Sequence, residues 1–272
     1  MNINLTRDEL LVFLSLLGAK TMNGLGDDPF ANLNDLEIVE RLNSGEHSLI
    51  SRGLLSIDEN TATLDETLMT LVGSSVFPDA TLLISRSEPD GSNEVHYFNA
   101  TSKVLVEQTS PRPGIHTFAQ LPDSEAFDIQ LEMLLASLTA AKTDAEHENL
   151  SGGFTIAADE MTQIVAYCQQ GEKAPVYQIL IQAGWPEDVA SKFAQHCTTF
   201  PTWVGVVAWN LRDEEPQALD PVMIFLGDDH CWLAENVENA QEKLHLQMIT
   251  AAQGAEKLMA LAEPLKKNYL QV

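Results

Sequence analysis

The fold is decided by an apolar stretch in the second half of the chain, which reads Thr202-Trp203-Val204-Gly205-Val206-Val207-Ala208-Trp209-Asn210-Leu211. The odd-numbered residues from Trp203 to Trp209 and the even-numbered residues between them are all apolar. Because β-branched and aromatic residues are also frequent, we predict a strand. A strand that is apolar on both faces is covered on both faces, or becomes covered when a partner binds. We therefore expect this strand to lie inside a sheet that contacts helices or another protein.

The elements around this strand occur twice along the chain. Helical patterns in Ala157–Thr199 precede it, and a strand region at Pro221–Leu233 and a helix at Ala240–Leu265 follow it. The first half repeats this order with a helix-rich opening from Leu5 to Leu71, an apolar helix at Phe127–Leu138 and, between them, short strands at Ala80–Ser85, Glu94–Asn99, Val104–Gln108 and Ile115–Leu121. We predict the α+β class, with two pseudo-symmetric halves packed face to face, each a helical segment followed by an antiparallel sheet and a closing helix.

A boundary between the halves is indicated by composition. The stretch Ala140–Gly153 combines charged and small residues with a glycine pair, which is typical of a linker. We place an N-terminal α+β half at residues 1–140, a linker at 141–153 and a C-terminal α+β half at 154–272.

Charge excludes several classes of partner. The 272 residues contain 40 Asp and Glu against 15 Lys and Arg, a formal net charge of −25. Such a surface repels nucleic acid and anionic lipid, and it either keeps the protein in solution or attracts a basic partner. We find no export signal or membrane-length apolar run, and the three cysteines form no disulfide pattern. We expect a soluble, cytoplasmic protein that does not associate with membranes.

Motifs for catalysis and cofactor binding are absent from the sequence. Gly24-Leu25-Gly26 lacks the third glycine of a dinucleotide fingerprint, and no Walker lysine, HExxH or GxSxG pattern occurs. We predict no enzyme, no cofactor and no catalytic residue. Asp228, Asp229 and His230 are weak candidates for metal ligands, because the same residues are typical of a tight turn.

One segment permits a different function. Residues 34–85 can be interpreted as a winged-helix element, with a helix, a turn at Ser44-Gly45, a second helix at Glu46–Leu55 and then a wing. Arg52 is the only strong base of that second helix, among several acids. Since a recognition helix must offer cations to phosphate, a role in protein contacts is as consistent with this pattern as DNA binding.

The second strand region resembles the C-terminal sheet of the EspG-type chaperones of type VII (ESX) secretion. The resemblance rests on the doubled plan, the acidic charge, the closing helix Leu244–Leu265 and three runs of sequence: Thr202–Ala208, Val222–Asp228 and Cys231–Ala234. A Gly-Arg-aromatic turn of these chaperones is replaced here by Gly227-Asp228-Asp229-His230. The resemblance implies a cytosolic, non-enzymatic chaperone that covers the apolar helical tip of a secreted protein.

We therefore predict a non-enzymatic protein-binding chaperone or adaptor. A winged-helix regulator and an enzyme with a site between the halves remain alternatives. The predicted contact elements are the strand connections Ser87–Glu94 and Leu211–Asp220. The predicted partner-binding residues are Trp203, Trp209, Asp90, Asn93, Asp213 and Glu214, although core packing is the ordinary role of such tryptophans.

Overall fold

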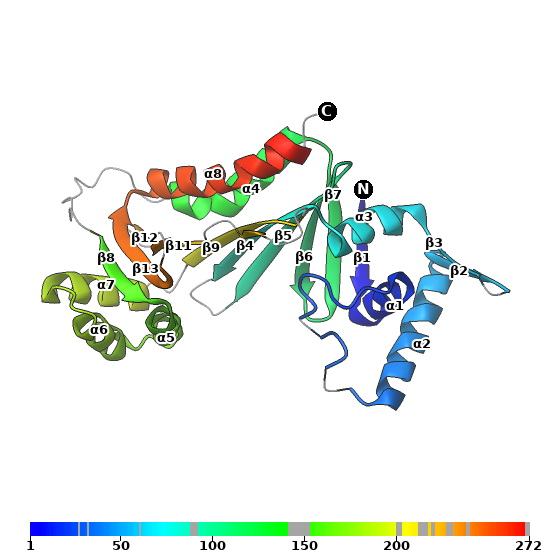
Figure 1. Ribbon diagram of the computed structural model, residues 1–272, viewed down its shortest axis with the longest axis horizontal. Helices are drawn as coiled ribbons and strands as arrows, with labels where there is room; N and C mark the ends of the chain where they lie inside the picture. Colours follow the sequence, from blue (N-terminus) through cyan, green and yellow to red (C-terminus); the bar gives the residue numbers. More distant parts are fainter. Residues whose placement is uncertain are drawn as a thin grey trace.

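An antiparallel sheet runs through the whole molecule in the computed structural model (Figure 1). The structure describes residues 1–26, 28–31, 33–59, 61–87, 92–140, 153–199, 203–211, 217–218, 221–226, 231–237 and 240–269. Within these ranges the sheet has 11 strands in the order β1-β7-β6-β5-β4-β9-β11-β12-β13-β8, with β10 paired to β9 outside this path. The combination of helices with an antiparallel sheet confirms the α+β class.

The first 140 residues form one arm of this sheet. Its strands are β1 (Asn2–Thr6), β4 (Ala80–Ser87), β5 (Asn93–Ala100), β6 (Leu105–Arg112) and β7 (Ile115–Leu121). Its helices are α1 (Arg7–Leu17), α2 (Asp35–Ser51), α3 (Glu66–Val76) and α4 (Ser124–Ala140). A small separate hairpin, β2 (Leu55–Asp58) and β3 (Thr61–Leu64), lies between α2 and α3. The capping box expected at Thr6 and Glu9 begins α1.

Residues from 154 onward form the other arm. Its strands are β8 (Phe154–Ala157), β9 (Trp203–Asn210), β10 (Gln217–Ala218), β11 (Val222–Phe225), β12 (Cys231–Val237) and β13 (Ala240–Ile249). Its helices are α5 (Ala158–Gln169), α6 (Lys173–Gln182), α7 (Glu187–Thr199) and α8 (Ala251–Tyr269). The linker predicted at residues 141–153 lies outside the described residues except for Gly153.

The two arms join edge to edge. β4 pairs with β9 in antiparallel register from Ala80 opposite Asn210 to Ser87 opposite Trp203. Outward from β4 the order is β5, β6, β7 and then the edge strand β1, which precedes α1. Outward from β9 the order is β11, β12, β13 and then the edge strand β8, which precedes α5, so the two arms have the same order. The expected face-to-face packing is therefore wrong, because β4 and β9 join the two arms edge to edge in one sheet.

Helices cover the two faces of the sheet differently. α4 and α8 lie side by side on one face, where Phe127, Leu131 and Leu258 pack on Leu82, Ile84, Val204 and Val206 (Figure 1). On the other face α1–α3 cover the β1 end around Phe13 and Phe118, and α5–α7 cover the β8 end around Phe193 and Trp232. No helix among the described residues is long and apolar enough to cross a membrane.

The winged-helix interpretation predicted a turn at Ser44-Gly45 that does not exist. Both residues lie inside the continuous helix α2. Gly45 is there because α1 crosses at this point: a Cβ atom on Gly45 would lie 2.3 Å from the backbone oxygen of Asp8. The Ser44-Gly45 pair, which suggested a break in the helix, instead allows close contact between α1 and α2. No separate recognition helix is present at Glu46–Leu55.

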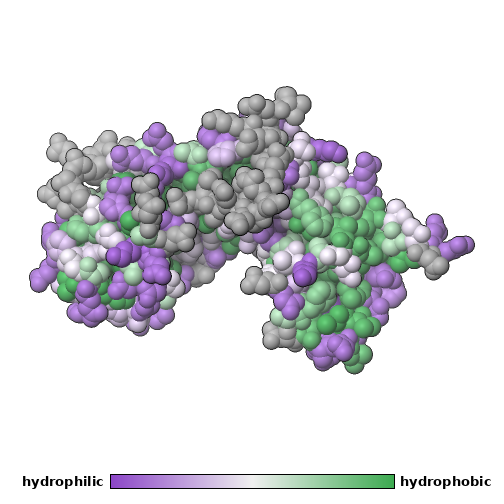
Figure 2. Space-filling model, viewed as in Figure 1, coloured by the Kyte–Doolittle hydropathy of each residue, from purple (hydrophilic) through white to green (hydrophobic). Residues whose placement is uncertain are grey.

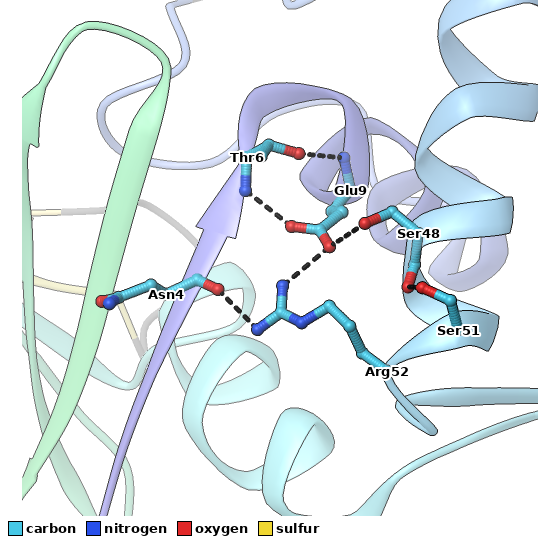
Figure 3. Close-up of polar contacts among 6 residues, drawn as sticks. All are labelled: Asn4, Thr6, Glu9, Ser48, Ser51 and Arg52. Carbon is cyan, nitrogen blue, oxygen red and sulfur yellow. Dashed lines mark hydrogen bonds and ion pairs between the residues drawn. The ribbon is translucent and has the colours of Figure 1, made fainter.

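The Arg52 side chain is 38% exposed, but its guanidinium is bound within the chain. Its guanidinium donates hydrogen bonds to the Glu9 carboxylate (2.7 Å) and to the backbone oxygen of Asn4 (2.9 Å), as Figure 3 shows. Glu9 accepts two further hydrogen bonds, from the Thr6 backbone N–H (2.7 Å) and the Ser48 hydroxyl (2.8 Å). This cluster ties α1 and α2 to the edge strand β1, so the one strong base of the predicted second helix has a structural role.

The closing helix is shorter than predicted. Residues 240–249 form β13 between β12 and β8, and the helix begins only at Ala251. The alternation Leu244-His245-Leu246-Gln247-Met248 has the period of a strand, and Leu246 is buried against the α5–α7 layer. The edge strands β1 and β8 were not predicted, because five- and four-residue strands are too short for a periodic signal.

Candidate partner-binding site

The register of the central strands places their side chains on two faces. Residues opposite one another in an antiparallel pair lie on the same face. Leu82 is opposite Ala208 and Phe98, and these three are buried below α4 and α8. Leu83 is opposite Val207 and Tyr97, so these three lie on the other face.

We call this second surface the central sheet face and define it by eight side-chain positions. They are Leu83 and Ser85 on β4, Val95 and Tyr97 on β5, and Trp203, Gly205, Val207 and Trp209 on β9. All eight are intermediate in burial, whereas the alternating residues Val204, Val206 and Ala208 are buried. The strands are thus apolar on both faces, but only one face is fully covered within this chain.

The two helical groups flank the central sheet face. In Figure 1 α1 and α2 lie below the β1 end, with α3 beside the upper ends of β1 and β7, and α5–α7 lie below the β8 end, with β4, β5 and β9 between the two groups. The space-filling view in Figure 2 shows that the outline of the molecule is hollowed between these groups. The face is therefore a recessed surface with a helical wall at each end.

Trp203 lies at one end of β9. A Cβ atom on Gly205 would lie 3.0 Å from the six-membered ring of Trp203, so the indole lies over this glycine. Its Nε1 donor is buried and has no hydrogen-bond partner among the described residues. Phe225 is opposite Trp203 on β11 and belongs to the core under α5–α7. Trp203 thus connects the central sheet face to the C-terminal helical group.

A cavity lies at the other end of the central sheet face. It has a volume of about 590 Å³ and is lined by Tyr97, Leu211, the loop from Thr21 to Gly26 and the end of α3. The loop is fixed to the sheet because Asn23 donates to Asn99 Oδ1 (3.2 Å) and Gln108 donates to the backbone oxygen of Asn23 (2.5 Å). The wall of this cavity is therefore a loop held by buried amides.

The central sheet face carries one titratable side chain among its eight positions, that of Tyr97. Burial raises the pKa of Tyr97, so its hydroxyl is a neutral hydrogen-bonding group at neutral pH. No group of three or more His, Cys, Asp or Glu side chains in the described part of the chain is placed to hold a metal ion. The face offers aromatic and aliphatic contact area and a few neutral polar groups.

The predicted site residues divide into those the structure places and those it does not describe. Trp203 and Trp209 lie at opposite ends of β9, both on the central sheet face. Asn93 begins β5 and is opposite Ser87, in the same row as Trp203. Its side-chain oxygen accepts a hydrogen bond from Ser85 (3.2 Å). The remaining predicted residues lie outside the described residues: Asp90, Asp213, Glu214, Asp228, Asp229 and His230.

Four apolar residues of the face were not predicted: Leu83, Val95, Tyr97 and Val207. Val207 belongs to the strand that was predicted to be apolar on both faces. Sequence alone does not show which of the two faces helices of this chain cover. Leu83 lies in a run, Leu82-Leu83-Ile84, that is typical of a strand buried on both faces. Only the pairing of β4 with β9, which sequence periodicity does not encode, shows that these residues are neighbours.

Comparison with known proteins gives a likeness of fold. No protein-family model matches the chain, and no curated protein matches it in sequence. Among solved structures it is similar to the Mycobacterium tuberculosis type VII secretion system chaperone EspG5, solved in complex with a PE25–PPE41 dimer. The TM-score is 0.58 over 96% of each chain, at 12% sequence identity. The chain therefore shares the fold of this chaperone along nearly its whole length.

Proposed function

We propose that this protein is a non-enzymatic chaperone or adaptor that shields an apolar helical segment of a partner protein at the central sheet face. The observation that carries the proposal is the half-buried apolar surface on β4, β5 and β9, recessed between two helical groups. Residues of this kind, with aromatic anchors, are characteristic of the core of a protein interface.

The backbone of the central strands limits how a partner can bind. β4 is already paired with β5 and β9, and β9 is paired with β4 and β11. The described residues of these strands leave no edge free there for strand addition, so a partner must bind through side chains. An amphipathic helix or a helical tip suits this requirement, since its own backbone groups are satisfied internally.

The likeness to EspG5 supports the same proposal from a second direction. That chaperone binds a PE25–PPE41 dimer, and the shared fold extends over both arms of this chain. We propose that this protein binds a helical secreted protein in the cytoplasm, before its export. Trp203, Trp209 and Asn93 are the proposed contact residues among those described, with Asp90, Asp213 and Glu214 as further predicted contacts.

The alternatives have less support. A winged-helix regulator requires a recognition helix with free cations, but Arg52 is bound to Glu9 and α2 is continuous. An enzyme requires titratable groups that converge in a cavity. Among the described residues that line the cavity beside Tyr97, the tyrosine is the only titratable side chain.

Photo-crosslinking in the native host tests the proposal. A photoreactive residue at Val207 samples the central sheet face, and the same residue at Glu256, on α8 over the opposite face, is the control. We expect a crosslink from position 207 that maps by mass spectrometry to an apolar helical segment of another protein. The proposal fails if position 207 gives no crosslink or the same products as position 256.

A further inference from the structure

We infer that the partner at the central sheet face carries basic residues beside the apolar segment that it buries. This inference rests on the proposed function and adds the chemistry of the partner. It starts from the charge of the chain, which has 40 acidic and 15 basic residues. A potential of this sign over a recessed surface favours the approach of cations.

Both helical groups that flank the face are acidic. In α5–α7 the bases are Lys173 and Lys192, and the exposed acids are Asp159, Glu172, Glu187 and Asp188. In the N-terminal group the bases are Arg7, Lys20, Arg41 and Arg52, and the exposed acids are Asp28, Asp35, Glu37, Glu40, Asp58, Glu59 and Glu66. Each of the two helical groups therefore carries excess negative charge.

Several bases are also neutralised by carboxylates of this chain. Arg41 pairs with Asp8 (3.3 Å) and Arg52 with Glu9 (2.7 Å) in the N-terminal group. On the opposite face Lys257 pairs with Glu235 (2.6 Å), and Lys266 pairs with Asp128 and Glu263. Each of these pairs joins one base to one acid, so the pairs leave the excess of acids over bases unchanged, and this excess acts on a partner. The central sheet face supplies apolar contact area. The acidic side chains of the flanking helical groups favour a partner with basic residues around its apolar segment.

Two synthetic helix–turn–helix peptides test this inference. Both have the same leucine- and phenylalanine-rich tip, and the surface positions flanking the tip are lysine in one peptide and glutamate in the other. Their binding to the full chain and to Val207→Asp is measured by fluorescence anisotropy, at about 50 mM and about 500 mM NaCl, where screening differs strongly. We expect the lysine peptide to bind at least about tenfold more tightly at low salt, mainly through faster association.

The outcomes separate this inference from the proposed function. Equal binding of the two peptides, or tighter binding of the glutamate peptide, overturns the basic partner and leaves the apolar face as a binding site. A lysine preference that is equally strong in Val207→Asp also overturns the inference, because the attraction is then not at this face. If neither peptide binds in either salt, both the inference and the proposed function are contradicted.

Discussion

At the scale of single residues, one buried carboxylate fixes how the N-terminal helices meet the sheet. Glu9 is buried, and it accepts hydrogen bonds from Thr6, Ser48 and Arg52. A buried charge is tolerated only when it is paired and hydrogen-bonded. The Arg52 guanidinium also occupies the backbone oxygen of Asn4 on the edge strand β1, which reduces the capacity of that edge to pair with another chain.

Replacing Arg52 with alanine leaves the Glu9 carboxylate buried without its cation. We expect the free energy of unfolding to fall by roughly 1.5–3 kcal/mol, the range for hydrogen bonds to charged groups. Arg41→Ala is the matched control, because the two arginines are similarly exposed (42% and 38%) but the Asp8 carboxylate is 30% exposed and that of Glu9 only 1%. The Arg41–Asp8 pair should therefore contribute at most about 1 kcal/mol. Urea denaturation measures both. Equal losses in the two variants would show that Glu9 does not depend on Arg52.

The same carboxylate predicts a pH dependence of stability. Burial raises the pKa of Glu9, but hydrogen bonds from Thr6, Arg52 and Ser48 outweigh it and lower the pKa below its ordinary value. A lowered pKa in the folded state stabilises the protein above the pKa of the unfolded chain, near 4.3, and this contribution is lost as pH falls through the folded value. The stability difference between wild type and Glu9→Gln should therefore be largest near neutral pH and shrink below about pH 4. A difference independent of pH contradicts the account.

At the scale of elements, substitutions at two helical glycines test whether Gly45 is needed for the close contact between α1 and α2. Gly45 of α2 lies against α1, where a Cβ atom would come within 2.3 Å of Asp8 O and 2.9 Å of Val12 Cγ2. Gly73 of α3 has only the flexible end of Met69 near its position, at 3.9 Å. We expect Gly45→Ala to destabilise the protein by about 1–3 kcal/mol through overpacking.

Gly73→Ala is the control for this substitution. It should be neutral or stabilise by up to about 1 kcal/mol, since alanine favours helix. Thermal unfolding followed by circular dichroism compares the two variants. If Gly45→Ala is as stable as the wild type, α1 and α2 do not cross closely at this residue.

Much of the element order could be predicted from the sequence, because meander strands and amphipathic helices have strong periodic patterns. β7 (Ile115–Leu121) and the start of α1 are examples. Each wrong prediction has a local cause. The helix break at Gly45 was predicted because a glycine at a helix contact resembles one at a turn, and β13 was assigned to the helix that follows it in the sequence. The strands β1 and β8 were missed because they are short. For the site, the tryptophans and the double apolar pattern of β9 could be recognised. The neighbours on β4 and β5 could not, because strand pairing over more than 100 residues leaves no local signal.

At the scale of the whole molecule, the β4–β9 pair makes the two arms one sheet. All 4 tryptophans lie between Trp185 and Trp232, so their fluorescence reports on the C-terminal arm, whereas far-ultraviolet circular dichroism reports on both. Because β4 and β9 share a complete register, we expect the two signals to change together in urea. Midpoints that differ by more than about 0.5 M would show that the arms unfold separately, as independent domains on either side of residues 141–153 would.

The half-buried side of this sheet is the proposed binding surface. The shared fold with EspG5 extends over both arms, and the half-buried face lies where the arms meet. A protein that binds there contacts residues from both halves of the chain. The pairing of the arms therefore creates a surface that neither arm has alone.

The most direct test of the central claim compares the affinity of the crosslinked partner for two variants with the same chemical change. Val207→Asp places a carboxylate on the central sheet face, and Ile129→Asp places one on an exposed position of α4 over the opposite face. With circular dichroism showing both variants folded, we predict that Val207→Asp weakens binding by at least about tenfold, or about 1.4 kcal/mol. Ile129→Asp should bind as the wild type does. An unchanged affinity for Val207→Asp, or an equal loss in both variants, would contradict the account.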